Sequence, residues 1–205
     1  MKHPRDSEKA LSRDVRDAIL LGAYIRAWGP PRVRVKSVRE DDDVAVYVFG
    51  GKSDFQRFAT VGVSALRRDD GSSADWELLA VLPSSLAGAS VEEVTNFILD
   101  LMAYSLRADV RIAPGETIPP SPLMPVSWVP RAILLDEPRG EAEELVHFQI
   151  GSQLVHLIWA IPIYKQELEL IVQSGLEAFD QLQRLAEWSL VDPDRPALGS
   201  STASG

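Results

Sequence analysis

The chain lacks the residues and segments on which several protein classes depend. Among its 205 residues there is no cysteine, which excludes a disulfide framework, a thiol nucleophile and a thiolate metal site. It also lacks any apolar run that approaches the roughly 20 residues of a membrane-spanning helix. The N-terminal segment 1–17 is charged and has no apolar core of the kind found in secretory signals. We therefore expect a cytoplasmic protein that does not contact a membrane.

Catalytic signatures are also missing. The sequence contains neither the GxSxG turn of serine hydrolases nor the GxGxxG and GxxxxGK[ST] loops that bind phosphates. His147 and His156 flank Gly151, so a hairpin there would make them cross-strand neighbours. A metal site would need a carboxylate beside them, such as Glu143 or Glu144, but histidines on strands are usually only hydrogen bonded. From these patterns we expect no cofactor and no metal, and they identify no catalytic site.

Charge is unevenly balanced, with a formal net charge of −9 and an isoelectric point of about 4.9. Nucleic-acid binding depends on clustered Lys and Arg, so this balance argues against a nucleic-acid partner. An acidic surface attracts cationic proteins through long-range steering, although it also serves plain solubility.

Hydrophobic periodicity predicts a single domain that contains both strands and helices. A helix capped by Ser7 should run to Trp28, with Leu11, Val15, Ala18, Ile19, Gly22 and Tyr24 or Ile25 as its apolar positions. A capping box of Ser90 and Glu93 predicts a second helix to about residue 108. The predicted strands are 32–38, 44–50, 55–66, 76–83, 131–135, 145–150 and 154–161.

The C-terminal half is organised around residues 156–182. An apolar strand should end at Pro162, and two amphipathic helices should follow, separated by Gly175. We place the N-terminal helix in residues 1–30, the body of the domain in 31–190 and a disordered tail in 191–205, because the tail is rich in Pro, Gly and Ser.

Four blocks of this sequence resemble the suppressor of fused family. The first is Pro162-Ile163-Tyr164 followed by Glu167-Leu168-Glu169 and Gly175. The others are FATVGVS (58–64), WELLAVLP (76–83) and GETIP (115–119), and together the blocks cover roughly residues 55–185. The chain departs from the family pattern at Glu116, where the family often has His, and at the start of the second helix, which lacks a Trp-Pro entrance.

The resemblance implies a single α+β domain, in which one mixed or antiparallel sheet packs against helices, and no catalytic machinery. The animal relative represses signalling by clasping a transcription factor, and bacterial single-domain members look like immunity proteins that neutralise a cognate toxin. The resemblance therefore implies a protein partner, with a toxin domain as the first hypothesis. A regulator that sequesters another protein, such as a transcription factor or secretion component, is the second. An enzyme with an unrecognised site around His147, His156 and Glu116 is the third.

Two acidic turns, residues 41–43 and 136–144, are the expected contact surface for a cationic partner. The oligomeric state stays open. The candidate partner-binding residues are Asp41, Asp42, Asp43, Glu116, Glu141, Glu143 and Glu144.

Overall fold

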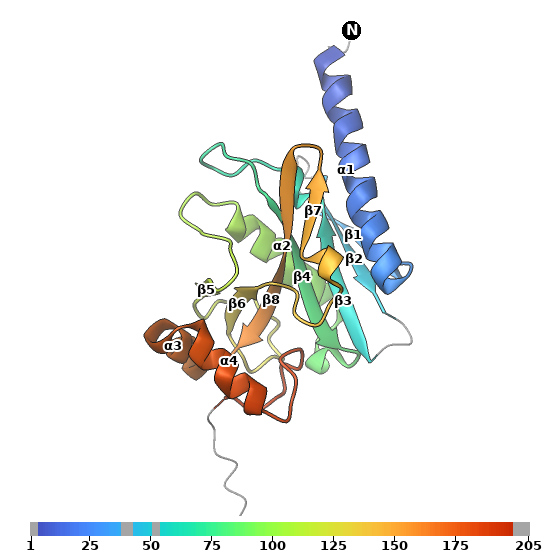
Figure 1. Ribbon diagram of the computed structural model, residues 1–205. Helices are drawn as coiled ribbons and strands as arrows, with labels where there is room; N and C mark the ends of the chain where they lie inside the picture. Colours follow the sequence, from blue (N-terminus) through green and yellow to red (C-terminus); the bar gives the residue numbers. More distant parts are fainter. Residues whose placement is uncertain (1–3, 38–42, 51–53, 199–205) are drawn as a thin grey trace, which may run out of the picture.

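A computed structural model describes residues 4–37, 43–50 and 54–198 (Figure 1). The side chains of residues 4–12 lie outside this description. The helices are α1 (Pro4–Trp28), α2 (Val91–Ser105), α3 (Lys165–Ser174) and α4 (Leu176–Leu185). The strands are β1 (Val33–Lys36), β2 (Ala45–Phe49), β3 (Phe55–Val61), β4 (Trp76–Pro83), β5 (Thr117–Ile118), β6 (Ala132–Asp136), β7 (His147–Ile150) and β8 (Gln153–Ile163). Short 3-10 helices are η1 (Val63–Ala65), η2 (Leu86–Gly88) and η3 (Glu143–Leu145).

The strands form one mixed sheet in the order β1-β2-β3-β4-β8-β6-β5. Every pairing along it is antiparallel except that of β4 with β8, which is parallel. The 11-residue β8 pairs with β7 through its first part and with β6 through its second part, both on the side away from β4. This arrangement confirms the predicted α+β fold.

Strand β8 lies at the centre because its sequence can be buried on both faces. Its residues from Leu157 to Ile163 are all buried, as a continuous apolar run predicts. The strand continues one residue beyond its predicted end, and Pro162 pairs with Ile133 of β6. Proline has no N–H to donate to the ladder, and near the end of a strand this loss removes fewer hydrogen bonds.

Helices cover both faces of the sheet (Figure 1). Helix α2 packs on one face, where Phe97 meets Trp128 edge to face at 5.6 Å between ring centroids. The proline-rich connection 112–128 packs against this face through Met124 and Trp128, and the Trp128 indole donates to the Leu86 carbonyl at 3.0 Å. Helix α1 and the pair α3 and α4 cover the other face. The core on that side contains Leu20 and Tyr24 of α1 and Phe179 of α4. No described helix has the length and apolarity needed to cross a membrane.

Helix α1 differs from its prediction at both its start and its buried face. It begins at Pro4, so Ser7 lies inside it and is not its cap. Leu20 and Tyr24 are fully buried, whereas Val15 and Ile19 are 53% and 41% exposed. The aromatic ring of Tyr24 packs against the rings of Phe49 and Phe148, and that contact sets the rotation of the helix.

Two further segments differ from the sequence-based expectation. The third strand ends at Val61 rather than continuing to Leu66, because Gly62 adopts a φ of 111° and the chain turns into η1. The predicted disorder of the tail is wrong for residues 191–198, where Arg195, Ala197 and Leu198 are buried. The ion pair between Arg195 and Glu167 fixes this segment. Residues 199–205 lie outside the described part of the chain.

Candidate partner-binding surface

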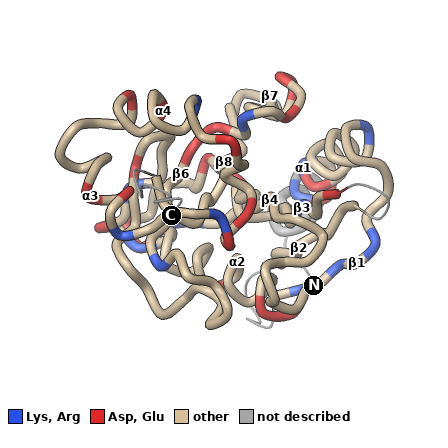
Figure 2. Tube along the Cα trace, turned by 90° about the horizontal axis from the view of Figure 1, so that it is seen from below, with Lys and Arg blue, Asp and Glu red and all other residues tan. Residues whose placement is uncertain are grey.

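The turn between β6 and β7 (residues 136–144) is rich in Asp and Glu (Figure 2), and side-chain contacts hold it in place. Arg139 donates to Asp180 of α4 at 2.6 Å and also forms an ion pair with Asp136 at the end of β6. Burial raises the pKa of Asp136 above its usual range, although the nearby Arg139 guanidinium acts in the opposite direction. The turn is therefore fastened to both the sheet and helix α4.

Glu141 fastens the same turn to the N-terminal helix. Its carboxylate accepts from the Arg57 Nε of β3 and from the Trp28 indole N–H of α1, each at 2.6 Å. The Glu141 side chain is only 8% exposed, and the Arg57 guanidinium carbon lies 5.7 Å from the Trp28 ring centroid. Glu141 is thus occupied inside the protein, which removes it from the exposed part of the candidate surface.

Glu143 and Glu144 are the exposed members of this turn. Both lie in η3, and Glu137 at the start of the turn is exposed as well, although sequence reasoning had not singled it out. Because the turn is anchored by Arg139 and Glu141, these carboxylates are presented on a supported loop. A supported loop loses less conformational entropy when a partner binds.

The remaining candidate residues lie elsewhere on the sheet. Asp43 is exposed beside Lys36, with 3.4 Å between Nζ and Oδ1. Glu116 is 37% exposed and pairs with Arg111 at 3.2 Å. They lie next to β2 and β5 respectively, near opposite edges of the sheet, so the candidates do not form one cluster. Asp41 and Asp42 lie outside the described residues.

The two histidines are cross-strand neighbours, as predicted. His147 of β7 pairs directly with His156 of β8. Among the residues that the structure describes, no group of three or more His, Cys, Asp or Glu side chains could hold a metal ion. Glu116 interacts with Arg111 beside the edge strand β5 and does not join the histidine pair in the contacts described.

A fully buried carboxylate, Glu77 of β4, was missed by sequence reasoning. Its Oε1 accepts from the backbone N–H of Gly62 at 3.2 Å and of Ser64 at 3.0 Å. Its Oε2 accepts from the Thr60 hydroxyl at 2.7 Å and from the Val63 N–H at 3.2 Å. Burial raises the pKa of Glu77, and the hydrogen bonds from Ser64, Thr60 and Gly62 act against that rise. The carboxylate joins β4 to the turn after β3.

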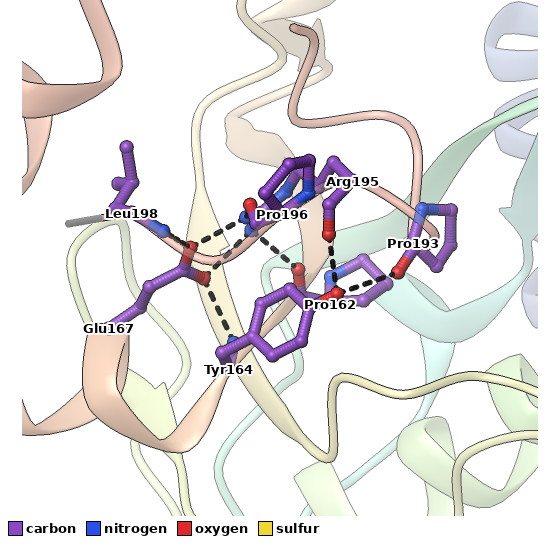
Figure 3. Close-up of polar contacts among 7 residues, drawn as sticks. All are labelled: Pro162, Tyr164, Glu167, Pro193, Arg195, Pro196 and Leu198. Carbon is purple, nitrogen blue, oxygen red and sulfur yellow. Dashed lines mark hydrogen bonds and ion pairs between the residues drawn. The ribbon is translucent and has the colours of Figure 1, made fainter. Parts of the chain in front are cut away.

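A second buried charge lies where α3 begins (Figure 3). Glu167 forms an ion pair with Arg195, with both side chains 0% exposed and 2.6 Å between Oε1 and Nη1. The same carboxylate accepts from the backbone N–H of Tyr164 at 2.9 Å and of Leu198 at 2.8 Å. Glu167 thus caps α3 and holds the C-terminal segment at once. A Glu three residues after a helix cap can be recognised in the sequence as part of a capping box, but its pairing with Arg195 cannot.

Comparison with known proteins decides the family. A family model described as suppressor of fused protein matches residues 40–196. This chain belongs to the suppressor of fused family. A search of curated proteins found no match.

Solved structures of the family share the fold at low sequence identity. A suppressor of fused homologue from Neisseria gonorrhoeae has a TM-score of 0.72 at 14% identity, covering 90% of this chain and 97% of that one. The chain described as the Sufu-Fu complex has a TM-score of 0.65 at 14% identity, with 91% of each chain covered. Drosophila suppressor of fused has a TM-score of 0.67 at 14% identity, covering 91% of this chain and 51% of that one.

The motifs that resemble the suppressor of fused family build the two buried carboxylate clusters. Gly62 and Ser64 of one block supply backbone donors to Glu77 of the next. In the block that contains Tyr164, Glu167 pairs with Arg195, and the Tyr164 hydroxyl donates to the Arg195 carbonyl. In the described structure these residues stabilise the domain from inside.

Proposed function

We propose that this suppressor of fused domain is a non-catalytic binding protein, and specifically an immunity protein that neutralises a cognate toxin by direct contact. The observation that carries the proposal is the anchored acidic turn, which presents Glu143 and Glu144 to solvent while Arg139 and Glu141 hold it from within. Family membership supports a binding role, since one family structure is described as the Sufu-Fu complex.

Charge complementarity indicates what kind of toxin such a surface fits. A toxin domain that attacks nucleic acids needs clustered Lys and Arg to hold phosphates. A chain with a net charge of −9 approaches such a basic domain faster than a neutral protein would. We place the contact on the turn 136–144, because Asp43 and Glu116 lie near opposite edges of the sheet and do not cluster with it.

The proposal is tested by expressing a toxin encoded beside this protein with and without the protein. We expect the wild-type chain to protect the cells and to form a 1:1 complex with the purified toxin domain, measured by light scattering after size-exclusion chromatography. If cells expressing each neighbouring toxin die equally with and without this chain, it is not an immunity protein.

The variant Glu143→Lys/Glu144→Lys tests the surface, and Glu92→Lys/Asp100→Lys is its matched control. The control makes the same change in net charge on α2, which covers the opposite face of the sheet from α1 and α4. We expect weaker protection only from the first pair of substitutions. Equal protection by both variants would place the contact outside this turn.

A regulator that sequesters a different protein is the second candidate, and the Sufu-Fu complex in the same family favours it. The two functions are separated by capturing partners from the native cell with the full chain as bait. Specific recovery of a transcription factor or secretion component, without protection against a toxin, supports the regulator and rejects the immunity protein.

A further inference from the structure

The C-terminal segment, residues 192–198, inserts one arginine into the interior of the domain (Figure 3). The two terminal nitrogens of Arg195 meet the two carboxylate oxygens of Glu167 at 2.6 and 2.8 Å. Nη2 also donates to the Pro162 carbonyl at 3.3 Å, at the end of β8. A planar fork on a carboxylate is the geometry that arginine forms and lysine does not.

Aromatic rings complete this environment. The Arg195 guanidinium carbon lies 4.6 Å from the Trp188 ring centroid and 5.4 Å from that of Tyr164. We call Pro162, Tyr164, Glu167 and Trp188 the arginine socket. Its polar contacts are made to the terminal nitrogens, whereas Nε of Arg195 has no hydrogen-bond partner. The socket therefore recognises the end of a guanidinium group rather than the stem of the side chain.

Residues 192–198 belong to no helix or strand, so Arg195 can leave the socket without moving any strand of the sheet. Segments outside helices and strands open locally at a lower free-energy cost than the core. When Arg195 leaves with its segment, Glu167 also loses the N–H of Leu198 and retains the N–H of Tyr164. A buried carboxylate without its counter-charge is strongly unfavourable, which drives the refilling of the socket by any guanidinium within reach.

We propose that the arginine socket is a binding site for arginine side chains, which the chain's own C-terminal segment occupies in cis. When that segment withdraws, an arginine presented by an extended segment of another protein takes the place of Arg195. This site lies at the start of α3 and is separate from the acidic turn, so the inference does not depend on the identity of the partner proposed above.

The first test uses the full-length Arg195→Ala variant and methylguanidinium as the probe. The substitution leaves Glu167 unpaired and should lower the Tm by roughly 5–15 °C. Millimolar methylguanidinium should recover several degrees of that loss without changing the wild-type Tm, and ethylammonium at equal ionic strength should recover much less. The double variant Arg195→Ala/Glu167→Gln should show no recovery. Recovery that is absent, or equal with both cations, overturns the proposal.

Refolding from urea keeps the test decisive if Arg195→Ala is too unstable to isolate. The yield of folded protein should then rise with methylguanidinium and not with ethylammonium, and an unchanged yield counts against the socket.

A labelled peptide of residues 192–198 provides the test in trans. It should bind the Arg195→Ala chain, measured by fluorescence anisotropy, whereas the same peptide with alanine in place of its arginine should not. Equal binding of the two peptides would show that the segment docks without its arginine and would overturn the proposal.

Discussion

Replacing Glu77 by Gln tests whether the buried carboxylate joins β4 to the turn after β3. Glutamine has nearly the same shape, so the substitution leaves the packing intact and changes one oxygen into an amino group. If the amide oxygen keeps the position of Oε1, it still accepts from Gly62 and Ser64. The amino group then faces the Val63 N–H, which donates to no other described acceptor and is left without one.

The magnitude follows from these contacts. An unsatisfied buried donor costs about 1–3 kcal/mol, and a weakened bond from the Thr60 hydroxyl adds roughly 1 kcal/mol. Glu77→Gln should therefore reduce the free energy of unfolding by about 2–4 kcal/mol. Urea denaturation followed by circular dichroism measures it, with Glu143→Gln on the exposed turn as the control. A loss at Glu77 no larger than that of the control would refute the role assigned to this carboxylate.

The stability difference between wild type and Glu77→Gln should also depend on pH. Burial raises the pKa of Glu77 in the folded state above its unfolded value of about 4.3. Between the two pKa values the folded state binds more protons, so the contribution of Glu77 to stability is greatest below the unfolded pKa. It declines as pH rises through the folded pKa. The lead of wild type over Glu77→Gln should thus be larger near pH 4 than near pH 7, and a lead that grows with pH would contradict this sign.

Other contacts give predictions of known direction. Glu141→Gln should lower stability by about 1–3 kcal/mol in urea denaturation, because its carboxylate accepts two hydrogen bonds where it is 8% exposed. Ser90→Ala should cost about 1 kcal/mol in the same assay by removing the cap of α2. That change should also raise the pKa of Glu93 part of the way toward its ordinary value in NMR titration, because it keeps the backbone hydrogen bond of Ser90 and removes the side-chain one, both of which lower it. Gly62→Ala should destabilise the fold measurably in thermal unfolding, because a Cβ there would lie 2.9 Å from the Asp43 carbonyl oxygen at a φ of +111°.

Local signals in the sequence were enough to predict most of the sheet and one helix accurately. The apolar runs of β4 and β8 identified both as strands, and Ser90 with Glu93 located the start of α2. Gly175 correctly separated α3 from α4. These features depend on neighbouring residues, so a pattern within a short window contains the information.

The parts that escaped prediction depend on contacts between distant residues. Helix α1 has apolar residues on more than one side, and only the rings of Phe49 and Phe148 select the side that Tyr24 occupies. The C-terminal composition is typical of disorder, yet Arg195 is fixed by a partner 28 residues earlier. In the sequence Glu141 is one of several acidic residues in a turn, and only the fold brings Arg57 into contact with it.

The association rate with a toxin domain encoded beside this protein, measured by stopped-flow fluorescence at low and high salt, tests the central claim most directly. We predict that wild type and Glu92→Lys/Asp100→Lys associate at similar rates at low salt, and that Glu143→Lys/Glu144→Lys is slower by about tenfold or more. High salt should reduce this difference because it screens the charges on the turn. Equal rates for all three proteins, or no complex with the toxin, would contradict the account.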